Sequence, residues 1–123
     1  METDPVVWFE IYVQDMQRAK TFYETVFQYA LSPLPAPGMD MLAFPATMGR
    51  PGAGGALVKM DGVPSGGNST LVYFSSQDCA IEAGRAAAAG GKVEREKMSI
   101  GEYGFIALLV DTEGNMIGVH SMA

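Results

Sequence analysis

The sequence predicts an α+β fold built from two successive modules, each with the element order βαβββ. Residues 6–13 alternate apolar with other side chains, which is the pattern of a strand, and residues 16–27 continue directly in a helical pattern. An aspartate stands where each of two helices would begin, Asp15 in the first half and Asp78 in the second. Three short strand-like segments follow each helix, so the order of elements repeats along the chain.

The first module is expected over about residues 5–61. One face of its leading strand is apolar and should lie under the helix (Val7, Phe9, Ile11 and Val13). The opposite face carries a carboxylate, Glu10, between the aromatic side chains of Trp8 and Tyr12, and it must either meet water or line a cavity. Residues 30–34, 39–45 and 56–60 are predicted to form the other three strands.

The second module is expected over about residues 69–122, after a Gly-, Ser- and Pro-rich linker. Residues 70–75 read as its leading strand, residues 79–89 as an alanine-rich helix, and residues 92–98, 104–110 and 115–121 as three strands. The last two strands are joined by a predicted hairpin turn over residues 111–114. Aligning the two aspartates places Trp8 on Leu71 and Glu10 on Tyr73, so we expect these faces of the leading strands to look into the same space.

Length and charge restrict the kind of protein this is. The 123 residues are most simply one domain, 1–123, and the net charge of −6 argues against a nucleic acid partner. Apolar runs fall short of the ~20 residues that a membrane span needs, and the N-terminal residues do not resemble a signal peptide. The single cysteine, Cys79, fits a reducing compartment. We therefore expect a soluble cytoplasmic protein without a membrane partner.

Three segments resemble the vicinal oxygen chelate superfamily, the group of glyoxalases, bleomycin resistance proteins and extradiol dioxygenases: residues 15–23, 89–93 and 111–120. Residues 9–11 and 117–121 look most like the subgroup described as lactoylglutathione lyase-related. The resemblance covers essentially the whole chain. It implies a glyoxalase-like fold, in which both modules form a curved mixed sheet around a central cavity that a second subunit often completes.

Metal enzymes of this family take histidine or glutamate ligands from the leading and final strands of each module. The resemblance places these positions at Trp8, Leu71 and Gly118, and near Gly55 or Ala56. These side chains offer no nitrogen or oxygen ligand, whereas a divalent cation needs at least three. The expectation is therefore a chain without the family's metal site and without a cofactor.

Glu10 lies two residues beyond Trp8, and His120 two residues beyond Gly118, so both should project from the face that carries the former metal positions. A carboxylate and an imidazole in a partly dry pocket could serve as catalytic acid and base. They could instead orient a ligand, or merely satisfy one another in a structural hydrogen bond. The predicted ligand-binding residues are Trp8, Glu10, Tyr12, Leu71, Tyr73, Met116 and His120.

Three functions remain open at this point. The preferred one is a metal-independent protein that binds a small amphipathic or aromatic molecule in the cavity, like the drug-binding members of the superfamily. The second is an enzyme of the lyase or isomerase type, either through acid–base chemistry by Glu10 and His120 or like lactoylglutathione lyase, with metal-dependent activity disfavoured. The third is a dimeric scaffold with no small-molecule role. Exposed sheet edges favour a homodimer in each case.

Overall fold

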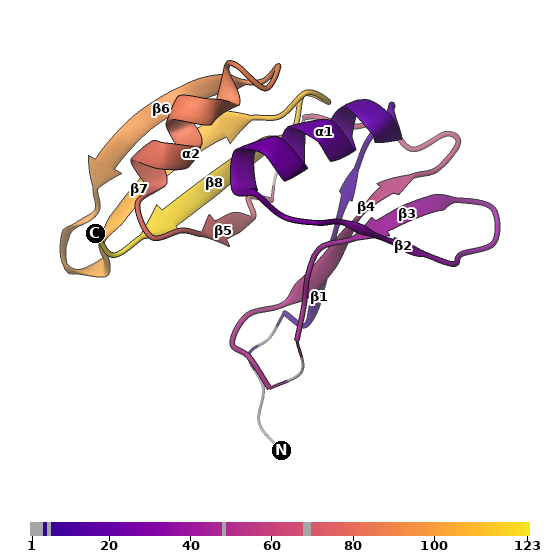
Figure 1. Ribbon diagram of the computed structural model, residues 1–123, viewed down its shortest axis with the longest axis horizontal. Coiled ribbons are helices and arrows are strands. Elements are labelled where there is room, and N and C mark those ends of the chain that lie inside the picture. Colours follow the sequence, from indigo (N-terminus) through magenta and orange to yellow (C-terminus); the bar gives the residue numbers. More distant parts are fainter. Residues whose placement is uncertain (1–3, 5, 48, 68–69) are drawn as a thin grey trace.

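In the computed structural model, which describes residues 4, 6–47, 49–67 and 70–123, each half of the chain folds as a βαβββ module (Figure 1). This confirms the predicted α+β fold. The first module consists of β1 (Trp8–Tyr12), α1 (Met16–Phe27), β2 (Ser32–Leu34), β3 (Asp40–Ala43) and β4 (Gly54–Lys59). The second consists of β5 (Tyr73–Ser75), α2 (Cys79–Ala86), β6 (Lys92–Ser99), β7 (Phe105–Val110) and β8 (Met116–Ser121), with a short 3-10 helix, η1 (Gly101–Tyr103), between β6 and β7.

The described strands form two separate four-stranded sheets of the same topology. The first sheet has the order β1-β4-β3-β2 and the second β5-β8-β7-β6. In each sheet the leading strand pairs in parallel with the last strand of its module, and the remaining pairs are antiparallel. The repeat seen in the sequence is therefore a repeat of structure.

The two predicted N-caps are confirmed. The Asp15 carboxylate accepts a hydrogen bond from the Arg18 backbone N–H at 3.0 Å, and the Asp78 carboxylate accepts one from Ala80 at 3.1 Å. Helix α2 ends at Ala86 rather than Ala89, because the chain then turns so that the Gly91 N–H bonds back to the Ala86 carbonyl at 2.9 Å. Among the described residues, neither α-helix has the length and hydropathy that crossing a membrane requires.

Strand β4 begins at Gly54, two residues before the predicted start, because two glycines extend its pairing with β1. Gly54 pairs with Trp8, and Gly55 with Phe9. A Cβ atom on Gly54 would lie 3.4 Å from the Trp8 ring, and one on Gly55 would overlap the Phe9 ring. The missing side chains therefore let both rings lie across the sheet, one on each face.

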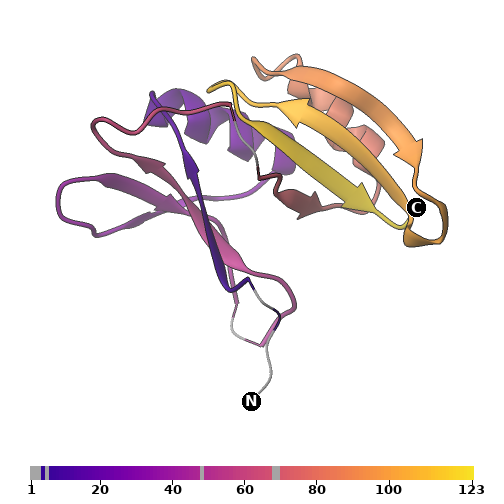
Figure 2. The same ribbon diagram turned by 180° about the vertical axis from the view of Figure 1, so that it is seen from behind.

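The buried apolar side chains of the two modules form one core. Ile11 and Val13 of the predicted apolar face are buried in it and Phe9 packs against it, whereas Val7 lies before β1 and is 69% exposed. Phe74 of β5 contacts five aromatic rings of the first module, with centroid distances of 4.6 to 6.3 Å. Helices α1 and α2 lie side by side, and the face of the second sheet turned away from α2 is open to view from behind (Figure 2). Each sheet thus has a core face and an outer face.

Candidate functional site

The outer face of β1 carries a carboxylate held by two aromatic side chains. The Trp8 indole N–H donates to Glu10 Oε2 at 3.2 Å, and the Tyr12 hydroxyl donates to Glu10 Oε1 at 2.8 Å. The bond to this carboxylate raises the pKa of the Tyr12 hydroxyl. Alternation along the strand predicts that these three side chains share one face, and the structure brings them into direct contact.

Small and apolar residues of β4 lie beside this cluster. Glu10 pairs with Ala56 and Tyr12 with Val58, and both partners are fully buried. The Trp8 side of the face stays open, because Trp8 is 44% exposed. The β4 residues beside the cluster are therefore covered, while Trp8 and Glu10 themselves are exposed on the outer face.

Gly55 and Ala56 were both predicted for the family's ligand position on the fourth strand, and the register of β1 and β4 separates them. Ala56 pairs with Glu10 and shares its outer face, whereas Gly55 pairs with Phe9 on the core side. The other predicted ligand positions are Trp8 in β1, Gly118 in β8, and Leu71, which lies just before β5 and is partly buried. Across the described ranges the structure brings together no three His, Cys, Asp or Glu side chains that could hold a metal ion. The residues at these positions do not fit the metal of the family's enzymes.

The outer face of the second sheet carries the other predicted site residues. Tyr73 of β5 lies over Gly118 of β8, where a Cβ atom would overlap the Tyr73 ring. Met116 and His120 alternate with the buried Ile117 and Val119, so they share this outer face. The His120 Nε2 lies 2.6 Å from the carbonyl oxygen of Tyr103 in η1, and it must donate because a carbonyl can only accept.

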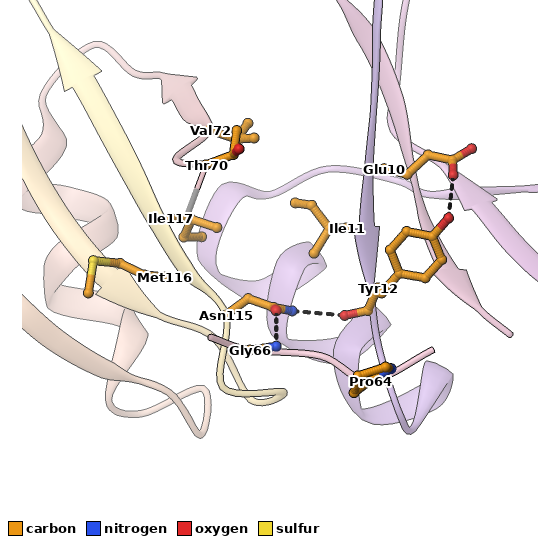
Figure 3. Close-up of a pocket in the computed structure, with 10 residues that line it drawn as sticks. All are labelled: Glu10, Ile11, Tyr12, Pro64, Gly66, Thr70, Val72, Asn115, Met116 and Ile117. Carbon is orange, nitrogen blue, oxygen red and sulfur yellow. Dashed lines mark hydrogen bonds between the residues drawn. The ribbon is translucent and has the colours of Figure 1, made fainter. Parts of the chain in front are cut away.

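The outer faces of the two leading strands do not look into the same space within one chain. In Figure 3, the side chains of Ile11 and Ile117 point into the gap between the modules. Those of Glu10 and Tyr12 point away from the gap on the side of the first module, and that of Met116 points away on the side of the second module. The reason is the shared core, which draws the two apolar faces together and leaves the opposite faces outward. Glu10 bonds to Trp8 and Tyr12, and His120 to Tyr103, so one chain does not pair Glu10 with His120.

A small pocket of about 210 Å³ lies in the gap between the modules (Figure 3). Its apolar wall includes Ile11, Val72 and Ile117, and Asn115 and Gly66 stand at its polar side. The amide of Asn115 is already engaged, since it donates to the Tyr12 carbonyl at 2.9 Å and accepts from the Gly66 N–H at 2.6 Å. Glu10 and Tyr12 of β1 and Met116 of β8 also line this pocket, so it adjoins the strand that carries the Glu10 carboxylate.

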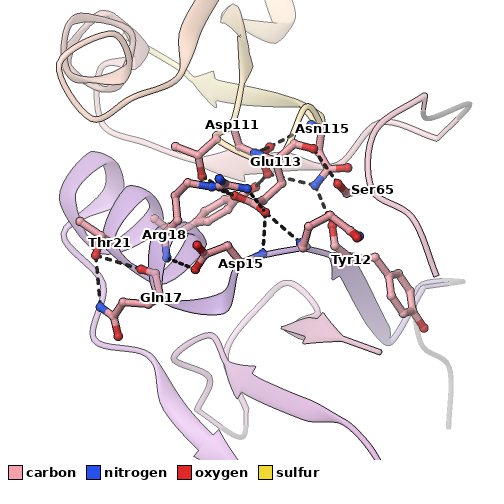
Figure 4. A network of polar contacts seen from close by, with 12 residues as sticks. Tyr12, Asp15, Gln17, Arg18, Thr21, Ser65, Asp111, Glu113 and Asn115 are labelled. Atoms are coloured by element: carbon pink, nitrogen blue, oxygen red, sulfur yellow. Dashed lines mark hydrogen bonds and ion pairs between the residues drawn. The ribbon is translucent and has the colours of Figure 1, made fainter. Parts of the chain in front are cut away.

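A buried polar network at the β7–β8 turn joins the modules (Figure 4). The Glu113 side chain is fully buried and accepts from Arg18 Nε at 2.7 Å and from the backbone N–H groups of Gln14 and Asp15 at 2.8 and 2.9 Å. Burial alone would raise the pKa of Glu113, but the bonds from Arg18, Asp15 and Gln14 outweigh it and hold the pKa at about 2. The second module thereby fixes the start of α1.

Asp111 completes this network. Its carboxylate accepts from the Tyr23 hydroxyl at 2.7 Å and from the backbone N–H groups of Glu113 and Asn115, each at 2.8 Å. The sequence predicts only a hairpin turn here. The turn holds two carboxylates between two apolar strands, and this was the signal in the sequence that could have indicated a buried polar network. Buried carboxylates need several hydrogen-bond donors, and here these donors come from distant segments of the chain.

Known proteins resemble this chain in sequence and in fold. The family profile described as "Bleomycin resistance protein-like N-terminal" matches residues 6–45. CFP32 of Mycobacterium tuberculosis (strain CDC 1551 / Oshkosh), whose name assigns it provisionally to the glyoxylases, is 34% identical over 120 residues. This match covers 96% of the present chain but 44% of the relative, so the chain spans less than half the length of that protein.

Two solved structures align along nearly their whole lengths. The glyoxylase/bleomycin resistance protein/dioxygenase domain from Frankia sp. EAN1pec has a TM-score of 0.74 at 13% identity, and the match covers 98% of both chains. TnmS3, an antibiotic binding protein from Streptomyces sp. CB03234, has a TM-score of 0.69 at 25% identity, with 100% of this chain and 99% of TnmS3 covered. The profile match and the 34% identical relative place the chain in the glyoxalase/bleomycin resistance family, and the paired βαβββ modules and the solved structures show its glyoxalase-like fold.

Proposed function

We propose that this chain binds a small amphipathic or aromatic molecule on the outer face of β1, without the metal chemistry of the family's enzymes. The observation that carries the proposal is the Glu10 carboxylate, held between Trp8 and Tyr12 on an open sheet face where metal ligands would otherwise stand. Aromatic side chains with a few placed polar groups are the usual lining of a small-molecule site. Indole, phenol and carboxylate here supply both kinds of contact.

The relatives support a binding role. TnmS3 is described as an antibiotic binding protein, and it matches this chain from end to end. From TnmS3 we extend to this chain only the broad class of ligand, a small organic molecule bound at the outer face of the sheet. A cytoplasmic location is part of the proposal and is supported by the acidic composition and the single cysteine, Cys79.

We further propose that two copies of the chain complete the site as a homodimer. The outer face of each sheet exposes large side chains, with Trp8 at 44% and Tyr73 at 47%. A second copy that places its second sheet opposite the first sheet of this chain would cover both residues. Glu10 of one copy and His120 of the other would then face the same space between the two sheets.

A thermal-shift screen with light scattering tests these proposals. Against a panel of small aromatic compounds, thiols and α-ketoaldehydes, we expect an aromatic compound at about ten times its dissociation constant to raise the melting temperature by roughly 5 °C, because it binds only the folded state. The shift should be lost in Trp8→Ala and kept in Ile81→Ala, which truncates an exposed apolar residue of α2. Light scattering should give twice the mass of one chain.

Three outcomes of these measurements would contradict the proposals. A monomer at micromolar concentration would contradict the dimer, and a panel without any stabilising compound would contradict small-molecule binding. Turnover of an α-ketoaldehyde without added metal, abolished in His120→Asn, would replace the binding role with the enzyme alternative.

A further inference from the structure

In the Trp8–Glu10–Tyr12 cluster, the N–H and O–H donors of the two aromatic side chains point to the Glu10 carboxylate and not to solvent. An indole carries one N–H donor and a phenol one O–H donor, and in this cluster both donate to the Glu10 carboxylate. The cluster therefore offers to a ligand the remaining lone pairs of the carboxylate and of the Tyr12 oxygen, together with two aromatic rings. All of these groups attract a positive charge or a hydrogen-bond donor.

Glu10 is the one charged side chain on the outer face of the described strands of the first sheet. Strand pairing assigns the other members of this face, because paired residues lie on the same side of a sheet. They are Trp8, Tyr12, Ser32, Leu34, Met41, Ala43, Gly54, Ala56 and Val58. The carboxylate thus stands on an apolar and aromatic surface without a lysine or arginine partner on that face.

The second sheet presents an acceptor as well. Since His120 Nε2–H donates to the Tyr103 carbonyl at 2.6 Å, the other ring nitrogen, Nδ1, is the acceptor of the neutral imidazole. In the proposed dimer this nitrogen would face the same space between the two sheets as Glu10 of the other copy. Lys92 and Arg95 share this outer face, but they lie on the edge strand β6, whereas His120 lies on β8 next to β5. The part of the second sheet around His120 therefore offers an acceptor to the ligand.

We infer that the ligand is a cation, an aromatic or amphipathic molecule whose protonated amine is bound by the Glu10 carboxylate between Trp8 and Tyr12. The inference rests on the proposed binding function and narrows it to one ligand class. The net charge of −6 acts in the same direction, because it attracts cations and repels anions at a distance. A neutral molecule of the same shape would keep the apolar contacts but lose the charge-assisted hydrogen bond and the attraction to the rings.

Three probes that differ in one end group test the inference: phenylbutylamine, phenylbutanol and phenylbutyrate. Isothermal titration calorimetry at physiological ionic strength should rank the amine first, roughly tenfold tighter than the alcohol, with the carboxylate weakest. In Glu10→Gln the amine and the alcohol should bind within about twofold of one another, and the affinity of the alcohol should stay near that of the parent protein. Glu10 is exposed, so this variant should fold normally.

A matched control removes a different carboxylate. Glu24 lies on α1 in an ion pair with Lys20, and Glu24→Gln should leave the order of the three probes unchanged. If the alcohol or the carboxylate binds at least as tightly as the amine, or if Glu10→Gln leaves the advantage of the amine intact, the cationic class is wrong while the binding function stands. If none of the probes binds and the compounds of the thermal-shift panel also fail, the proposed function itself is wrong.

Discussion

Phe74→Ala is expected to lower the free energy of unfolding by about 3–5 kcal/mol, the range for removing a phenylalanine ring from a packed core. Phe74 is 7% exposed, and its ring contacts those of Phe9, Tyr23, Phe27, Tyr29 and Phe44. Since Phe74 belongs to the second module and the five rings to the first, the substitution opens a cavity where the modules meet. Denaturant unfolding followed by circular dichroism measures the loss.

Ile81→Ala is the matched control, because this α2 side chain is 48% exposed, and it should change the free energy by well under 1 kcal/mol. Calorimetry of the parent protein should show one cooperative transition for both modules. Two separate transitions, or a loss below about 1 kcal/mol in Phe74→Ala, would contradict the single core.

Glu113→Gln is expected to destabilise the protein by on the order of 3 kcal/mol near neutral pH. The folded state lowers the pKa of this carboxyl from 4.5 to about 2, and each pKa unit corresponds to about 1.4 kcal/mol. Glutamine keeps the shape of the side chain but loses the charge that Arg18 and two backbone N–H groups stabilise. The difference in unfolding free energy between parent and variant measures the contribution.

The same contribution should depend on pH in a defined direction. Because the folded pKa of Glu113 lies below the unfolded value, the stabilisation is fully present above pH 4.5 and is lost as the pH falls toward about 2. The difference in unfolding free energy between the parent protein and Glu113→Gln should therefore become smaller as the pH falls through this range. Glu94→Gln removes one member of an exposed pair, 3.8 Å from Lys92, and should cost less than about 0.5 kcal/mol. If this difference in unfolding free energy did not change with pH, the charge of Glu113 would not be what stabilises the contact between the modules.

Local patterns predicted most of the fold. Both N-cap aspartates, the two helices and the repeated order of strands follow from hydrogen-bonding and periodicity rules that act over a few residues. The errors lie at ends of elements. β5 begins at Tyr73 instead of residue 70, and the η1 helix lies between two predicted strands, where no element was predicted. Such boundaries depend on tertiary pairing, as the early start of β4 shows.

The grouping of the candidate site residues on one strand face was predicted within each module, but their arrangement between modules was not. Alternation along β1 grouped Trp8, Glu10 and Tyr12, since strand geometry alone decides which residues share a face. The direction of that face relative to His120 depends on how the modules pack. That packing is set by Phe74 and the Glu113 network, whose partners are distant in sequence. A local pattern therefore could not show that the outer faces point apart in one chain.

Trp8 is the chain's single tryptophan, so its indole signals report on the outer face of β1 alone. The most direct measurement is a titration of the isotope-labelled protein with a compound that stabilises it, following the Trp8 indole N–H resonance. Binding at the proposed site predicts a saturable shift of this resonance, with a dissociation constant equal to that from calorimetry. A compound that stabilises the protein and shifts other resonances, but leaves the Trp8 indole unmoved, would show that ligands bind elsewhere and would contradict the site.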